Sequence, residues 1–145
     1  MRQLLSLCLV IVFTASSFTV TPTRGITDEK EVGIQFTSTS WANILKKAKA
    51  ENKLIFLDAY ASWCGPCKML QKNVFTQKTV GDYFNKRFIN VKMDMEKGEG
   101  PALAQMYPLE AYPTLLFING NGRVVKKAIG YMSADELLNV GKSVK

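Results

Sequence analysis

The segment LIFLDAYASWCGPCKMLQKN, residues 54–73, is the stretch from which the fold of this chain can be predicted. Its first part, LIFLDA at 54–59, is a compact apolar run of the kind found in buried strands. Its last part, residues 68–73, is predicted to continue as a helix. The motif WCGPC at 63–67 therefore lies between the carboxyl end of a strand and the start of a helix, where open α/β sheets place their functional sites.

The rest of the chain alternates between predicted strands and predicted helices. Further strands are predicted at residues 35–37, 88–94, 114–118 and 124–128, and further helices at about 41–51, 79–85, 102–107 and after a capping box that starts at Ser133. The sequence NGNG at 119–122 is a strong signal for a tight turn, so the last two strands should form an antiparallel pair. This order predicts an α/β fold with a parallel core sheet and an antiparallel edge hairpin.

The N-terminal region, residues 1–33, is predicted to lie outside the folded domain. A basic start, an apolar run at 4–13 and small residues at 14–17 match a secretory signal peptide, to which we assign residues 1–20. The apolar run is about half of the roughly 20 residues that cross a membrane, but counting on to residue 20 leaves an N-terminal anchor as an alternative. Residues 21–33 form a polar leader, and residues 34–145 form the domain. We expect an exported protein, located in the periplasm or cell envelope or secreted.

The formal net charge of the chain is +7, and its lysines are spread out, with neighbouring pairs only at 46–47 and 126–127. A nucleic-acid-binding arm would show a basic block, so no nucleic-acid partner is expected. The charge is that of a mildly basic soluble domain, although attraction to acidic partners or to a membrane surface is an alternative. We expect the domain to be a monomer.

The chain has three cysteines, Cys8, Cys64 and Cys67, and no histidine. Cys8 would be removed with a cleaved signal peptide. A structural zinc site needs four nitrogen or sulfur ligands, so a metal would require carboxylates or a partner chain, and we predict none. A disulfide between Cys64 and Cys67 closes such a short loop that it would stabilise the fold little. A redox couple is therefore the best interpretation of the pair.

The spacing of the motif suits thiol–disulfide exchange, which needs an attacking thiolate and a second thiol that releases the mixed disulfide. Cys64 would lie at a helix N-terminus, where free amides and the helix dipole favour a negative charge and lower the thiol pKa. Pro66 suits the first turn of the helix and stiffens it. Gly65 allows another backbone to come close. Cys67 lies one turn into the helix, less exposed, and can attack back.

Two neighbouring residues fit the same chemistry. Asp58 is an acid inside the apolar run, and burial would raise its pKa and make it a proton acceptor or donor for Cys67. The alternative is that Asp58 is half exposed near the end of the strand. Trp63 could cover the site and offer a partner an apolar contact, or it could be a packing aromatic. Lys68 could steady the thiolate or simply be solvated.

The sequence WCGPCK, residues 63–68, resembles the active-site signature of the thioredoxin family. Asp58 stands six residues before Cys64, where thioredoxins carry a buried acid, and YPT at 112–114 is similar to the family's cis-proline loop. The resemblance implies a thioredoxin fold, with a central mixed sheet and helices on both faces. It also implies that Pro113 is cis, that its loop lies against the disulfide, and that Tyr112 presents its backbone to a substrate strand. Gly130 resembles the family's late glycine near the site.

The segment at 72–88 departs from cytosolic thioredoxin and is more similar to envelope domains such as the carboxyl-terminal domain of the disulfide reductase DsbD, and the loop MDMEKGEGP at 93–101 is somewhat longer than in cytosolic thioredoxin. The resemblance implies a reductase of protein disulfides that uses no separate cofactor and is recharged by a membrane thiol electron donor. The same residues could instead serve a disulfide donor or isomerase, or a non-catalytic polypeptide-binding module. The expected substrate-binding residues are Trp63, Gly65, Pro66, Tyr112 and Pro113.

Overall fold

The computed structural model describes residues 32–145. The predicted signal peptide or anchor, at residues 1–20, and most of the predicted leader lie outside the described residues. The described chain contains these elements in order: α1 (Trp41–Glu51), β1 (Leu54–Tyr60), α2 (Gly65–Asn73), α3 (Lys78–Arg87), β2 (Phe88–Asp94), α4 (Gly100–Met106), β3 (Thr114–Ile118), β4 (Val124–Ile129) and α5 (Ala134–Ser143).

The four strands form one mixed sheet in the order β2-β1-β3-β4. β1 runs parallel to β2 and antiparallel to β3, and β3 runs antiparallel to β4. The crossover between β1 and β2 contains α2 and α3, as a parallel connection requires. The mixed sheet implied by the thioredoxin resemblance and the edge hairpin are confirmed, whereas the parallel core predicted from the element order is limited to β1 and β2, because β3 enters the sheet antiparallel to β1.

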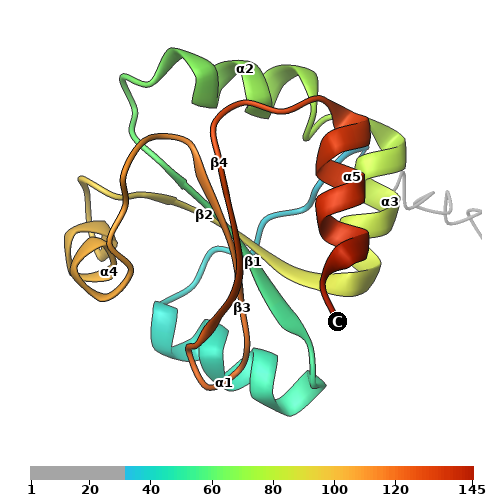
Figure 1. Cartoon of the computed structure of the whole chain (residues 1–145). Helices are drawn as coiled ribbons and strands as arrows, with labels where there is room; N and C mark the ends of the chain where they lie inside the picture. Colours follow the sequence, from blue (N-terminus) through green and yellow to red (C-terminus); the bar gives the residue numbers. More distant parts are fainter. Residues whose placement is uncertain (1–31) are drawn as a thin grey trace, which may run out of the picture.

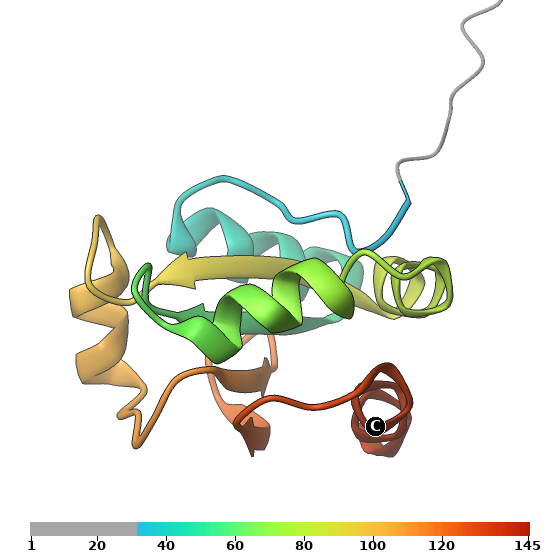
Figure 2. The ribbon, with the colours of Figure 1, turned by 90° about the horizontal axis from the view of Figure 1, so that it is seen from above.

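Helices cover both faces of this sheet, because alternate residues of each strand point to opposite sides. On one side, Ile55 and Leu57 of β1 pack with α1 and with Leu103 of α4. On the other side, Phe56 packs with residues of α2, α3 and α5. Figure 1 shows α1 and α2 on opposite sides of the strands, and Figure 2, turned by 90°, shows α2 in front of the strands and α1 behind them.

The short helix α4 lies at the end of the sheet to which β2 points, which is also the end at which α2 begins (Figure 2). Because β1 and β2 are parallel, their carboxyl ends meet at this edge, and the WCGPC motif follows β1 there. This edge is the one that carries functional sites in open α/β sheets.

The prediction of a strand at residues 35–37 is wrong. The amide of Thr37 does donate to the carbonyl of Asn90 in β2, at 2.8 Å. The amide of Gln35, however, donates to the side-chain oxygen of Asn85 at 2.8 Å, so it is not available for a ladder with β2. One backbone bond does not make a strand, and the segment runs along β2 as irregular chain.

Candidate active site

The two cysteines lie at the start of α2 and form a disulfide with an S–S distance of 2.07 Å and a Cα–Cα distance of 5.3 Å. Cys64 is the N-cap of the helix, and its Sγ accepts a hydrogen bond from the amide of Cys67 at 3.1 Å. Pro66 occupies the first turn, where the missing N–H removes a group that would have no helical partner. Both sulfur-bearing residues are buried, while Gly65 and Pro66 between them are exposed. The helix start therefore favours negative charge on Cys64 when the disulfide opens.

Asp58 is fully buried in β1, on the face that α2 covers. The side-chain amide of Gln71, from α2, donates to Oδ2 of Asp58 at 3.1 Å. Oδ1 has no hydrogen-bond partner among the described residues. Burial raises the pKa of Asp58 to about 7, and the Gln71 hydrogen bond and the charge of Lys92 on the neighbouring strand oppose this rise. The alternative of a half-exposed Asp58 is excluded, and the acid can hold or release a proton near neutral pH.

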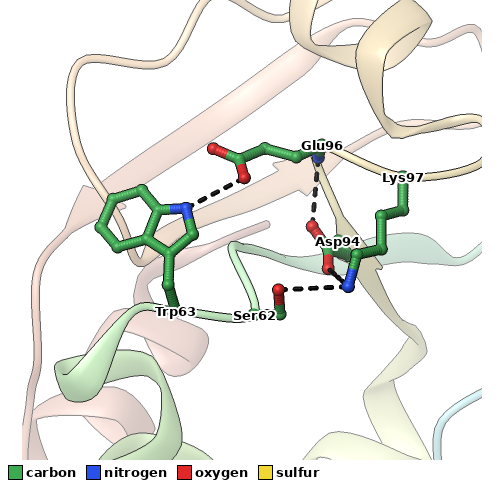
Figure 3. Close-up of polar contacts among 5 residues, drawn as sticks. All are labelled: Ser62, Trp63, Asp94, Glu96 and Lys97. Carbon is green, nitrogen blue, oxygen red and sulfur yellow. Dashed lines mark hydrogen bonds and ion pairs between the residues drawn. The ribbon is translucent and has the colours of Figure 1, made fainter.

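Trp63 precedes the first cysteine and is 67% exposed, so it is not a core aromatic. Its indole Nε1 donates to Glu96 at 2.9 Å, and its ring meets the edge of the Tyr112 ring with centroids 5.8 Å apart. Figure 3 shows how the segment after β2 reaches this loop. The ammonium of Lys97 lies 3.2 Å from Ser62 Oγ and 3.5 Å from Asp94. Trp63 is thus exposed but held in one orientation.

The loop before β3 lies beside the cysteines. The peptide bond between Tyr112 and Pro113 is cis, and Tyr112 packs against the buried cluster of Ala61, Cys64 and Cys67. The buried Pro113 accepts a hydrogen bond at its carbonyl from the amide of Gly130, at 2.8 Å, which ties this loop to the end of β4. A groove of about 380 Å³ adjoins the loop and is lined by Trp63, Leu109, Glu110, Ala111 and Tyr112.

A family model for the thioredoxin-like domain matches residues 41–145. The chain belongs to the thioredoxin-like family. This family is one of thiol–disulfide oxidoreductases, and a cysteine pair at disulfide distance is present at the predicted position. The resemblance stated from WCGPCK is therefore confirmed, and so is the thioredoxin fold.

Three known proteins show how this thioredoxin-like chain relates to others. A solution structure from Bacteroides thetaiotaomicron, provisionally named a disulphide-isomerase, is 49% identical with a TM-score of 0.69, covering 80% of this chain and 98% of that one. The thiol:disulfide interchange protein DsbD of Tatumella citrea is 29% identical over 121 residues, which is 80% of this chain and 21% of that protein. The chain therefore corresponds to about a fifth of the length of DsbD. The oxidised carboxyl-terminal domain of Neisseria meningitidis DsbD shares the fold, with 24% identity and a TM-score of 0.60, covering 72% of this chain and 91% of that domain.

The residues singled out from the sequence of this thioredoxin-like chain gather at one edge of the sheet, although they come from β1, α2 and the loop before β3. Sequence reasoning missed Gln71, which contacts Asp58, and Glu96, which holds Trp63. Glu96 lies in the segment at 93–101, whose departure from the thioredoxin pattern was the one available signal, and no sequence pattern pointed to Gln71. Within residues 32–145, no group of three or more His, Cys, Asp or Glu residues could hold a metal ion. No helix in this part of the chain has the length and apolarity needed to cross a membrane.

Proposed function

We propose that this chain is an exported oxidoreductase that reduces disulfides in proteins through the Cys64–Cys67 pair. The observation that carries the proposal is the disulfide at the N-terminus of α2, with the buried acid Asp58 on the face of the sheet beneath that helix. A disulfide that only stabilised the fold would require neither an acid that titrates near neutral pH nor an exposed surface around it. The reaction needs no dissociable cofactor, since the cysteine pair itself carries the two electrons.

The reaction begins with the reduced pair. Cys64, as a thiolate stabilised by the helix start, attacks one sulfur of the substrate disulfide, and the other sulfur leaves as a thiolate that takes up a proton. Cys67 then loses its proton to Asp58, and its sulfur attacks Cys64. The mixed disulfide breaks, the second substrate sulfur leaves as a thiolate that takes up a proton, and the Cys64–Cys67 disulfide forms. The substrate disulfide has gained two electrons and the cysteine pair has lost two.

The surface around the pair is proposed to bind the substrate polypeptide. Trp63, Gly65 and Pro66 are exposed next to the two cysteines, and Tyr112, from the loop that also contains Pro113, packs against the cysteine cluster and the Trp63 ring. A side chain added at Gly65 would meet nothing within 4 Å, so this point is open to an approaching backbone. The groove beside Trp63 and Tyr112 would take a side chain that neighbours the substrate cysteine.

The cellular setting is proposed from the sequence pattern of residues 1–33. A signal peptide or anchor at residues 1–20 would deliver the domain, residues 34–145, to the periplasm or another space outside the cytosol. An exported reductase needs electrons from a membrane thiol carrier. The similarity to the DsbD region supports a partner of this kind. We propose that the domain works as a monomer.

The test uses the full-length chain and two serine variants. The reduced wild-type protein should reduce the disulfides of a small protein such as insulin, and Cys64→Ser should abolish this activity. Cys67→Ser should accumulate a mixed disulfide between Cys64 and the substrate, because the second thiol is absent. A polypeptide-binding module would bind its partner equally well as wild type and as Cys64→Ser. Equal binding by the two proteins, together with no disulfide reduction by the wild-type protein, would exclude the oxidoreductase.

A second candidate is a disulfide donor or isomerase, favoured by the provisional name of the Bacteroides relative, which is 49% identical. The two directions differ in the reduction potential of the cysteine pair, which can be measured by equilibration in graded thiol buffers. A value near the roughly −270 mV of thioredoxin indicates a reductant, and a value near the roughly −120 mV of DsbA indicates a disulfide donor.

A further inference from the structure

The face of α2 that carries Cys67 also carries Gln71, one helical turn later. The side-chain amide of Gln71 reaches across to β1 and donates to Oδ2 of Asp58 at 3.1 Å. The same helix therefore carries the cysteine that must lose a proton and the amide that contacts the acid proposed to receive it. Residue 71 was assigned no role from the sequence.

The two oxygens of the Asp58 carboxyl differ in their surroundings. Oδ2 accepts the Gln71 hydrogen bond, while Oδ1 is buried and has no partner among the described residues. A buried acceptor without a partner is unfavourable, so a group that donates to it at some stage of the reaction would be stabilised there. With Oδ2 held by an amide from α2, rotation of the carboxyl is restricted and Oδ1 is the oxygen left to act.

We propose that Gln71 is a positioning residue that holds the Asp58 carboxyl by Oδ2 and leaves Oδ1 as the atom that takes the proton of Cys67. This inference rests on the proposed function, in which Asp58 receives that proton. It adds the residue that orients the acid and identifies the oxygen that acts.

The choice of a neutral amide at this position has a chemical reason. A donor next to an ionised carboxylate forms a stronger hydrogen bond than one next to the neutral acid, so Gln71 favours the ionised form that can accept a proton. A lysine would hold the carboxylate ionised, and a glutamate would oppose its ionisation. The other titratable groups that interact with Asp58 are Lys92, in register on β2, and Tyr60, two residues along β1, while its partner on β3, Leu115, is apolar. Gln71 offsets part of the rise in the Asp58 pKa that burial causes, and it does so without holding Asp58 in one protonation state.

The experiment measures the titration of the Asp58 carboxyl in the oxidised full-length chain, from its side-chain carbon chemical shift against pH. Gln71→Leu removes the donor and puts an apolar side chain of similar volume in its place. Its Asp58 midpoint should rise by about one pH unit, a tenfold change in the ionisation constant. Lys72→Leu, on the exposed side of the same helix, is the matched control and should leave the midpoint unchanged. Asp58→Asn identifies the signal. An unchanged midpoint in Gln71→Leu would overturn the proposal.

Gln71→Glu provides a second variant, in case the leucine disturbs the fold. Two carboxyls sharing this site should titrate in two steps, with the upper step above the wild-type midpoint. An Asp58 midpoint that stays at its wild-type value, while the introduced carboxyl titrates at an ordinary value, would show that residue 71 does not contact Asp58 and would overturn the proposal.

The proton step is read separately, as the rate at which Cys67 resolves a preformed mixed disulfide on Cys64, against pH. In Gln71→Leu this profile should shift upward together with the Asp58 midpoint. A shifted midpoint with an unshifted profile would refute the proton transfer from Cys67 to Oδ1. If Asp58→Asn also leaves the profile unchanged, the failure lies in the Asp58 step of the proposed function rather than in the contact with Gln71.

Discussion

The buried acid Asp58 should make the stability of the protein fall as the pH rises from about 4 to about 7. Burial raises the pKa of Asp58 from 3.8 to about 7 in the folded protein, whereas the unfolded chain leaves the acid near its ordinary value. Between these two values, the folded state holds a proton that the unfolded state has already released. The free energy of unfolding decreases with pH wherever the folded state binds more protons, so stability is lost as the pH rises through this window.

The size of the effect follows from the same two pKa values. They differ by about three pH units, and each unit corresponds to about 1.36 kcal/mol, so ionised Asp58 should destabilise the fold by about 4 kcal/mol. Asp58→Asn is similar in size and cannot ionise, which removes this pH dependence. The difference in unfolding free energy between the variant and wild type should therefore change by about 4 kcal/mol, in favour of the variant, as the pH rises from about 4 to about 8.

The assay is denaturant unfolding of the oxidised full-length chain, for wild type and Asp58→Asn, across this pH range. Glu51 and Glu136 also have shifted pKa values, but they are present in both proteins, so their contributions cancel in the difference. A constant difference from acid to neutral pH would mean that Asp58 does not carry a proton in the folded protein. That result would refute the reasoning from burial and would also remove the acid as a proton carrier near neutral pH.

Three further predictions test other parts of the structure. Glu96→Ala removes the acceptor that holds Trp63, so KM for a protein disulfide should rise roughly fivefold at unchanged kcat, and an unchanged KM would show that the contact does not orient the ring. Gly81→Ala places a methyl group 2.3 Å from the backbone of Gly33, so the melting temperature should fall by several degrees, and a wild-type value in calorimetry would contradict this packing. Ser133→Ala breaks the capping box of α5, which should cost about 1 kcal/mol in chemical unfolding, and a difference near zero would mean that the cap contributes nothing.

Most of the fold could be predicted from the sequence because its signals are local. The apolar run at 54–59 is long enough for a buried strand, and the spacing of Ser133 and Glu136 specifies a capping box that the structure contains. The strand predicted at 35–37 failed for a reason that is not local. The amide of Gln35 is taken by a side-chain oxygen 50 residues later in the chain, at Asn85, and no pattern in residues 35–37 signals that contact.

The candidate site divides in the same way. The cysteine pair and the position of Asp58 six residues before it follow from one continuous segment, so both were found in the sequence. The contacts of Gln71 with Asp58 and of Glu96 with Trp63 join residues 13 and 33 positions apart. They depend on how α2 is placed over β1 and on where β2 ends, which are tertiary properties. Spacing along the chain predicts the reactive atoms, and packing decides which side chains orient them.

The destabilising effect of Asp58 bears on what the site is for. At neutral pH the acid opposes folding, and its burial leaves one carboxyl oxygen without a partner among the described residues. A leucine or asparagine would fill the same place in β1 with less penalty, so the demands of the fold do not explain an acid there. The disulfide does not offset the effect either, because it closes too short a loop to stabilise the chain much. An unfavourable acid beneath the helix that starts at Cys64 is explained if its proton is needed, and Gln71 then reduces the effect of burial while keeping the carboxyl able to titrate.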